Sequence, residues 1–348
     1  MFNIGGRAIG PGLPCFIIAE AGVNHNGNLD RAHSLIDAAA KAGADAVKFQ
    51  TWITERMCAP GAKMASYQRA NVPNSSDQFT MLKGLELPFE RHKELKEHAE
   101  ASGLVFLSTP DDVDSARFLC DLGVPAIKIG SAELTNLPFL RELAQFKKPL
   151  ILSTGMGTME ATRRAVKTIR ESGDVPLSLL HCVSAYPAQE EEMNLRCISS
   201  MQQEFGVPVG LSDHTRGSLA AVLGVALGAS ILEKHLTLDH SLPGPDHTAS
   251  LEPKEFAEMV NAVRMAERML GSGVKVPTEV ESSTLEAVQR TVLFARDLPA
   301  AHVLEASDLV ALRCGLTGLT PDQMDGLIGR RLRGAVKKHK PVGLEHLL

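Results

Sequence analysis

Short apolar runs alternate with amphipathic stretches through the first 270 residues of the chain. Each run is continuous and rich in Val, Ile and Leu, which is typical of strands buried on both faces of a parallel sheet. Eight runs occur, at residues 15–20, 45–51, 104–109, 126–131, 150–155, 177–182, 209–213 and 231–235. Eight stretches with helical periodicity separate them, at residues 29–42, 89–102, 113–122, 137–145, 159–172, 195–204, 218–227 and 254–270.

The number and order of these elements predict an α/β fold, a (β/α)8 TIM barrel over residues 1–271. A doubly wound open sheet is the alternative, but it usually has a glycine-rich phosphate turn after its first strand. Residues 272–288 are polar and contain Gly, Ser, Pro and Thr, so we interpret them as a linker. Residues 289–348 predict a β-rich domain that is too small to bury a large core alone.

Composition then excludes several classes of protein. The chain has 348 residues, 44% of them hydrophobic and 22% charged, which is typical of a globular protein. A net charge of −5 and an aromatic content of 4% disfavour a nucleic-acid partner. The sequence lacks an apolar run long enough to cross a membrane, a signal peptide and a C-x-x-C pair among its six cysteines. We therefore expect a cytoplasmic protein with reduced thiols.

In a TIM barrel the active site lies at the carboxyl ends of the strands, where this sequence places polar residues on every strand. Those within the strand ends are Glu20, Lys48, Gln50, Ser108, Thr109, Lys128, Ser131, Ser153, Thr154, His181, Ser212, Asp213, Glu233, Lys234 and His235. Glu133, Ser184, Tyr186 and His214 follow just after a strand. Together they predict a ligand with several anionic and polar groups.

Lys48 and Lys128 each interrupt an apolar run, so their side chains are expected inside the barrel. A buried ammonium group is costly unless it meets an anion, which favours a pair of cations that hold a phosphate or carboxylate. Hydroxyl groups could complete such a site, from Thr109, Ser131, Ser153 and Ser212. One alternative is a structural lysine paired with a neighbouring glutamate, and another is a lysine that forms a Schiff base.

His214 and His235 end neighbouring strands, so both imidazoles could reach one divalent metal ion. Two histidines leave most of the coordination sphere to water and substrate, which suits Lewis-acid catalysis. The alternative is a pair of histidines that cap the strands without a metal. Asp246, in the turn-rich loop after the last strand, could face the site or only initiate a turn. The basic run at 330–340 is interpreted as a solvated face.

Motifs from all eight strands resemble those of the sialic acid synthase family, which includes N-acetylneuraminate, legionaminate and spore-coat polysaccharide synthases. They are IIAEAGVNHNG, KFQ, LSTP, KIGSAELTN, ILSTGM, LLHCVSAYP, GLSDHT, EKHLTLD and GPDHTASLEP, in this order. The tail from Arg290 to Leu348 resembles the antifreeze-like (SAF) domain of that family. The resemblance implies condensation of phosphoenolpyruvate with an N-acylated mannose-type sugar, release of phosphate, a Mn²⁺ or Mg²⁺ requirement and a domain-swapped homodimer.

The resemblance also implies roles for individual residues. His214 and His235 match metal ligands, and Glu20 or Glu133 is the candidate for proton transfer. Phosphoenolpyruvate would be held by Lys48, Thr109, Lys128, Ser131, Ser153 and Ser212. The sugar site would be lined by Glu20, Gln50, Glu133, Tyr186 and Asp246, with Asn71 or Asn74 as further candidates, and Arg313 would reach the partner subunit's site. Ser184 stands where some relatives have Asn, and Arg313-Cys314-Gly315 replaces the usual Arg-Pro-Gly.

The acceptor sugar is expected to be N-acetylmannosamine, with 2,4-diacetamido-2,4,6-trideoxymannose as the alternative. Other phosphoenolpyruvate-condensing barrels, such as 3-deoxy-octulosonate phosphate synthases, lack the SAF tail. A Schiff-base aldolase would use pyruvate and need no metal. A non-catalytic carbohydrate-binding or ice-binding protein would have no reason to carry two barrel lysines and two histidines at metal-binding spacing.

Overall fold

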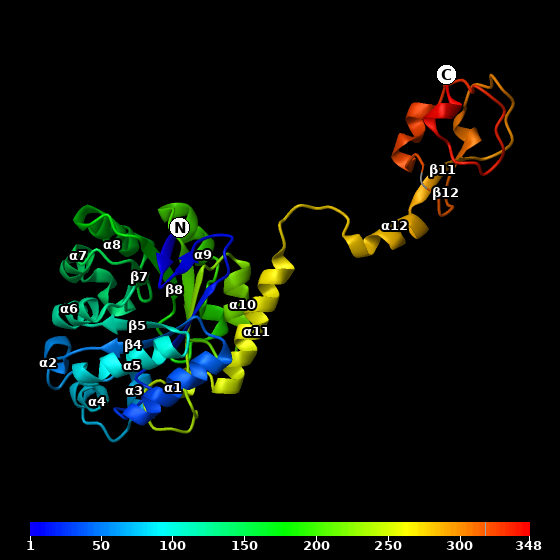
Figure 1. The fold of residues 1–348 in the computed structure, drawn as a ribbon. Helices are drawn as coiled ribbons and strands as arrows, with labels where there is room; N and C mark the ends of the chain where they lie inside the picture. The colour runs from blue at the N-terminus through cyan, green and yellow to red at the C-terminus, as the bar shows by residue number, and fades with distance from the viewer. Residues whose placement is uncertain (317) are drawn as a thin grey trace. The chain divides into compact units, whose positions relative to one another are not determined.

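The structure, a computed structural model, describes residues 1–316 and 318–348. The chain forms two compact units, Met1–Gly271 and Ser272–Leu348. The first unit contains an eight-stranded sheet, and the second contains a two-stranded antiparallel sheet (Figure 1). None of the helices within the described residues is long and apolar enough to cross a membrane.

The first unit is a (β/α)8 barrel, which confirms the predicted fold class. Its parallel strands are β3 (Phe16–Gly22), β4 (Ala46–Thr51), β5 (Val105–Pro110), β6 (Ile127–Ile129), β7 (Leu150–Ser153), β8 (Leu177–Cys182), β9 (Val209–Asp213) and β10 (Ile231–His235). Hydrogen bonds join them in the order β5-β4-β3-β10-β9-β8-β7-β6, and β5 and β6 are neighbours at the seam. Parallel pairing places the carboxyl ends of all these strands at one end of the barrel.

Helices follow the strands and pack on the outside of the sheet (Figure 1). They are α1 (Leu29–Ala42), α5 (Phe89–Ala101), α6 (Val113–Leu122), α7 (Leu137–Gln145), α8 (Met159–Ser172), α9 (Cys197–Phe205), α10 (Leu219–Ala226) and α11 (Pro253–Leu270). Short 3₁₀ helices follow β6, β8 and β10, namely η1 (Ser131–Thr135), η2 (Glu190–Glu192) and η3 (His247–Ala249). The boundaries follow from capping residues: Asn28 accepts a hydrogen bond from the backbone of Arg31, and Gly43 ends α1 with φ 81°.

An N-terminal hairpin covers the amino ends of the strands. It consists of β1 (Phe2–Ile4) and β2 (Arg7–Ile9), and the sequence pattern did not predict it. Its turn residues Gly5 and Gly6 both have positive φ, as a tight two-residue hairpin turn requires. The buried Ile4 and Ile9 join one apolar cluster with the inward-facing residues Phe16, Ile18, Ala46, Leu107, Ala126, Ile151, Leu180 and Ile231. The barrel interior is therefore filled at the amino ends of the strands, and only the carboxyl ends are left for polar side chains.

A long segment between β4 and α5 forms three short helices that the sequence pattern also did not predict. They are α2 (Thr54–Met57), α3 (Ser66–Asn71) and α4 (Gln78–Leu85). A separate apolar cluster around the buried Trp52 holds this segment together, with Val23, Met64, Met81, Leu82 and Leu85. Most connections in barrels are only a few residues long, so a segment of this length points to a role at the site.

The second unit contains the small antiparallel sheet of β11 (Arg290–Phe294) and β12 (Leu309–Arg313). Its core is formed by residues such as Val292, Phe294, Leu332 and Val342. The segment predicted as a linker is partly helical, with η4 (Glu279–Glu281) and α12 (Ser282–Val288), and the later 3₁₀ helices are η5 (Ala306–Asp308), η6 (Pro321–Leu327) and η7 (Leu344–His346). Many of the hydrogen bonds in this unit join irregular loops, which fits its weak signal in the sequence.

Candidate active site

The alternation of side chains along each strand decides which polar residues face the barrel interior. Along β10, Glu233 and His235 point inward, whereas Lys234 points outward and pairs with Asp213, Nζ to Oδ2 2.8 Å. Ser108 and His181 also have partners away from the interior, the hydroxyl of Thr51 at 2.7 Å and the carbonyl of Met193 at 2.6 Å. The structure thus divides the predicted strand-end residues into an inward set and a set that supports the sheet.

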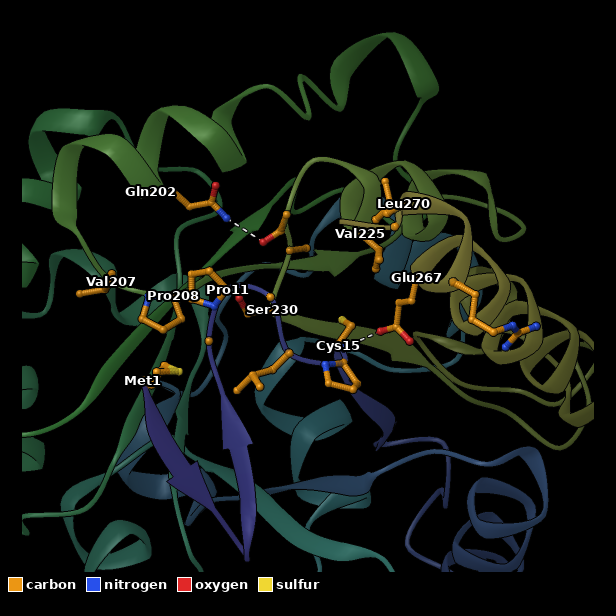
Figure 2. Close-up of a pocket in the computed structure, with 18 of the residues that line it drawn as sticks. Met1, Pro11, Cys15, Gln202, Val207, Pro208, Val225, Ser230, Glu267 and Leu270 are labelled. Carbon is orange, nitrogen blue, oxygen red and sulfur yellow. Dashed lines mark hydrogen bonds between the residues drawn. The ribbon is translucent and has the colours of Figure 1, made fainter. Parts of the chain in front are cut away.

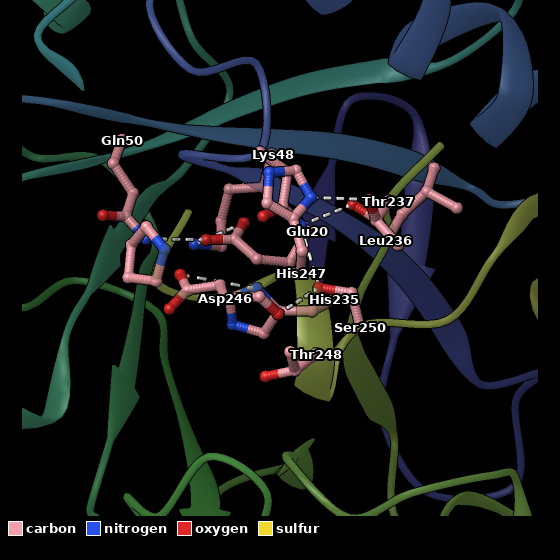
Figure 3. Close-up of polar contacts among 12 residues, drawn as sticks. Glu20, Lys48, Gln50, His235, Leu236, Thr237, Asp246, His247, Thr248 and Ser250 are labelled. Atoms are coloured by element: carbon pink, nitrogen blue, oxygen red, sulfur yellow. Dashed lines mark hydrogen bonds and ion pairs between the residues drawn. The ribbon is translucent and has the colours of Figure 1, made fainter. Parts of the chain in front are cut away.

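Two lysines and two glutamates form a buried charge cluster at the centre of the inward set. Figure 3 shows two of them, Glu20 and Lys48. The Nζ atom of Lys48 lies 2.8 Å from Oε2 of Glu20 and 2.8 Å from the hydroxyl of Thr109. Glu233 lies between the lysines, with one oxygen 3.7 Å from Nζ of Lys48 and the other 3.6 Å from Nζ of Lys128. All four charged residues are at most 4% exposed. The cations are therefore balanced before any ligand binds.

The two carboxyl groups differ in how readily they take up a proton. Burial raises the pKa of Glu20 to about 7, although Lys48 acts in the opposite direction. Burial also disfavours the charged form of Glu233, but Lys128 and Lys48 outweigh it and lower its pKa. Burial lowers the pKa of Lys128, and nearby Lys48 contributes to the same shift. An anionic ligand that approaches the lysines would favour proton uptake by Glu20, because Glu233 holds its negative charge more strongly.

Of the hydroxyl groups predicted beside the lysines, that of Thr109 contacts Lys48, and the other three have different partners or none among the described residues. The Ser212 hydroxyl donates to Glu233 Oε1 at 3.0 Å, and the Ser153 hydroxyl is buried without a hydrogen-bond partner among the described residues. The Ser131 hydroxyl accepts a hydrogen bond from the backbone of Gly155 at 3.0 Å. A Cβ atom at Gly155 would lie 2.3 Å from the Ser184 hydroxyl and 2.7 Å from that of Ser131. A side chain at position 155 would therefore displace both hydroxyl groups, so glycine is required there.

His214 and His235 lie together next to the charge cluster, with ring centroids 5.4 Å apart. Nδ1 of His214 donates to the carbonyl of Val183 at 2.8 Å, which leaves Nε2 with a free lone pair. Nδ1 of His235 is buried with no hydrogen-bond partner among the described residues, and an Asp246 oxygen is 3.9 Å away. Burial and the neighbouring His214 hold the pKa of His235 well below its usual range. A neutral imidazole with an unused nitrogen fits a divalent metal ion.

This pair of histidines would leave a metal ion open to other ligands. Across residues 1–316 and 318–348, no group of three or more His, Cys, Asp or Glu residues is arranged to hold a metal ion. Water and substrate oxygens would have to fill the remaining positions, which is the arrangement of a catalytic metal rather than a structural one. Tyr186 packs beside both histidines, with ring centroids 4.1 Å from His214 and 5.7 Å from His235.

The residues predicted to line a sugar site lie at the open end of the barrel. Gln50 donates to Glu20 Oε1 at 3.0 Å (Figure 3). Burial raises the pKa of Asp246 to about 6. Glu133 is half-buried and accepts from the amide of Asn136 at 2.6 Å. Asn71 is half-buried with its amide bonded to another loop, and Asn74 is exposed, whereas Arg313 is exposed on β12 of the second unit. Thus Gln50, Asp246 and Glu133 surround the barrel opening.

A cavity of about 780 Å³ lies at the opposite, amino end of the strands (Figure 2). Several of its polar groups bond to one another: Glu267 accepts from the backbone of Cys15 at 2.5 Å, and Gln202 donates to the carbonyl of Gly228 at 2.7 Å. Residues at this end of a barrel usually serve stability rather than chemistry. The charge cluster and the histidine pair therefore mark the candidate active site.

Comparison with known proteins identifies the family. The profile of the NeuB family matches residues 35–275, well over half of the chain. The chain belongs to the NeuB family. A SAF domain profile matches residues 289–348 of this NeuB-family protein. These matches confirm the resemblance stated from the sequence motifs.

Individual relatives of this NeuB-family chain carry several synthase names. The chain is 45% identical over 93% of its length to N,N'-diacetyllegionaminic acid synthase from Legionella pneumophila, of which 92% is covered. It is 35% identical over 96% of its length to N-acetylneuraminate-9-phosphate synthase from Homo sapiens, again with 92% covered. Among solved structures, the chain resembles N-acetylneuraminic acid synthetase from Leptospira borgpetersenii, crystallised in complex with citrate. The two sequences are 34% identical, and the structures superpose with a TM-score of 0.73 over 82% of this chain and 95% of that one.

Two members of the candidate site were not singled out from the sequence of this NeuB-family chain. Glu233 was grouped with all the strand-end residues, although its two-residue spacing from His235 places both on one face of β10. Tyr67 belongs to none of the strand-end patterns, yet its ring stacks on that of Tyr186 with centroids 4.8 Å apart. Alternation along the strand could have revealed Glu233, whereas no sequence signal links Tyr67 to Tyr186.

Proposed function

We propose that this protein condenses phosphoenolpyruvate with an N-acylated mannose-type sugar to give a nonulosonic acid and phosphate. The observation that carries this proposal is the buried pair Lys48 and Lys128 beside the histidine pair His214 and His235. The lysines suit the phosphate and carboxylate of one substrate, and the histidines suit a metal that activates the other. Membership of the NeuB family supports the same reaction class.

The acceptor can be one of two sugars, N-acetylmannosamine or 2,4-diacetamido-2,4,6-trideoxymannose. The higher identity to the Legionella legionaminic acid synthase, 45% against 35% for the human enzyme, favours the diacetamido sugar. The charge cluster does not discriminate between them, because it contacts the other substrate. Specificity is expected from residues at the barrel opening, such as Gln50 and Asp246.

The proposed mechanism assigns each group of residues a separate task. Lys48 and Lys128 bind the phosphate and carboxylate of phosphoenolpyruvate, helped by hydroxyl groups of Thr109, Ser131, Ser153 and Ser212. Mn²⁺ or Mg²⁺ held by His214 and His235 would polarise the aldehyde oxygen of the open-chain sugar. The enol carbon then attacks the aldehyde carbon, water adds to the former enol-ether carbon, and phosphate leaves. Glu20 exchanges a proton in this sequence, since burial brings its pKa to about 7.

The direct test measures phosphate release from phosphoenolpyruvate with each of the two sugars, with Mn²⁺ and with a chelator. We expect release with one sugar that the chelator abolishes and that added Mn²⁺ restores. Release that continues in the chelator would contradict the metal requirement. Folded, Mn²⁺-loaded protein that releases no phosphate with either sugar would overturn the proposed reaction, and borohydride trapping with pyruvate would then test the Schiff-base alternative.

Arg313 is proposed to hold the N-acyl group of the sugar in the partner subunit of a domain-swapped homodimer. We expect Arg313→Ala to raise the KM for the sugar at least tenfold and to change the KM for phosphoenolpyruvate less than twofold. Co-expression with the His235→Ala variant then tests the exchange between subunits. A mixed dimer would regain one intact site, so up to about a quarter of wild-type activity should return. The assay uses a sugar concentration far below the KM, where Arg313→Ala is expected to keep at most about a tenth of the wild-type rate. Co-expressed variants that are no more active than Arg313→Ala alone, or a monomeric mass by light scattering, would contradict the proposal.

A further inference from the structure

The segment between β4 and α5 places one face of α3 over the open end of the barrel. Tyr67 and Asn71 lie one helical turn apart on this short helix, so their side chains share a face. The Asn71 amide donates to the carbonyl of Pro245 at 2.7 Å and to the Thr248 hydroxyl at 3.1 Å. Both acceptors flank Asp246, a candidate sugar-site residue. The helix is therefore fixed to the loop that carries this carboxyl group.

A second contact of α3 is an aromatic stack that leads to the histidine pair. The rings of Tyr67 and Tyr186 lie 4.8 Å apart with an interplanar angle of 26°. Tyr186 in turn packs 4.1 Å from the ring of His214. These are the only two tyrosines in the chain, and each is half-buried. An aromatic pair therefore lies beside the two histidines and next to the loop that carries Asp246.

We propose that Tyr67 is a positioning residue for the acceptor sugar, a role that rests on the proposed condensation. Its ring holds the ring of Tyr186 in one orientation. The aromatic pair then forms a wall that packs against the carbon chain of the open-chain sugar. A stacked aromatic pair contributes a favourable interaction beyond the apolar area that it buries. A fixed wall would also limit the orientations of the sugar aldehyde, which affects the chemical step. Phosphoenolpyruvate, bound deeper at the lysines, would be insensitive to this contact.

The kinetic test compares substitutions of Tyr67 with one elsewhere on the same helix. Tyr67→Ala should raise the KM for the sugar about tenfold and lower kcat, with the KM for phosphoenolpyruvate within twofold of wild type. Tyr67→Phe keeps the ring and should restore both parameters. Arg69→Ala is the matched control, because Arg69 is exposed on α3. Equal changes in both KM values, or no rescue by phenylalanine, would overturn the positioning role.

A spectroscopic test separates the stack from catalysis. Incorporation of 3-fluorotyrosine gives two ¹⁹F signals, because the chain has two tyrosines, and Tyr67→Phe assigns the signal of Tyr186. Tyr67→Ala should shift and broaden this signal, whereas Arg69→Ala should leave it unchanged. If the chemical shift and line width of the Tyr186 signal do not change when the Tyr67 ring is removed, the inference is overturned even if the enzyme is active. If Tyr67→Ala shifts the Tyr186 signal but the wild-type protein releases no phosphate with either sugar, the proposed reaction fails. The acceptor role of Tyr67 then fails with it, while the packing contact stands.

Discussion

Replacement of His235 by alanine is expected to reduce phosphate release by about a thousandfold and to abolish Mn²⁺ binding. His235 presents a buried ring nitrogen without a hydrogen-bond partner among the described residues, next to His214. With one of two protein ligands removed, the ion would be lost, and Lewis-acid activation contributes several kcal/mol to such reactions. Electron paramagnetic resonance of free Mn²⁺ measures the binding directly, and a phosphate assay measures turnover.

His181→Ala is the matched control for this experiment. His181 is also a buried histidine at the end of a strand, but its ring bonds to the carbonyl of Met193 and does not join the inward set. The control should therefore still bind Mn²⁺, even if it loses some stability. If His235→Ala binds Mn²⁺ as tightly as wild type, or keeps more than a tenth of the activity, His235 is not a metal ligand and the pair caps the strands instead.

The barrel could be predicted from sequence because its strands are buried on both faces. Such strands appear as continuous apolar runs, and β8, β9 and β10 begin and end where these runs do. The same contrast revealed Lys48 and Lys128, since a charge inside an apolar run is conspicuous. Their pairing with Glu20 and Glu233 was less visible, because it depends on which strands become neighbours in the sheet.

The segments that the sequence did not reveal are stabilised by contacts distant along the chain. Helices as short as α2, α3 and α4 gain little from intrinsic propensity, and the segment that contains them packs around Trp52 through Met64 and residues of α4. The hairpin of β1 and β2 likewise depends on Ile4 and Ile9 entering the base of the barrel. Where such tertiary contacts decide the local structure, periodicity carries no signal, so the role of Tyr67 could not be foreseen.

A second large effect is expected from Lys234, whose importance lies in folding rather than chemistry. Lys234 and Asp213 are both completely buried, and Nζ of the lysine also donates to the carbonyl of Thr215 at 2.5 Å. Lys234→Met would leave the Asp213 carboxylate buried without its cation, which typically costs about 3–5 kcal/mol. We expect this loss in the unfolding free energy of the barrel, measured by chemical denaturation.

The double variant Lys234→Met/Asp213→Asn distinguishes charge burial from simple loss of packing. Asparagine keeps an acceptor for the backbone and hydroxyl of Thr215, each 2.8 Å from Asp213 Oδ1, but removes the buried charge. The double variant should recover most of the stability that Lys234→Met loses. Lys254→Met, on the exposed surface of α11, is the control and should change the unfolding free energy by less than about 0.5 kcal/mol. Because His214 lies between Asp213 and Thr215, the single variant should also weaken Mn²⁺ binding. A single variant as stable as Lys254→Met would show that this buried pair does not support the strand ends that carry both histidines.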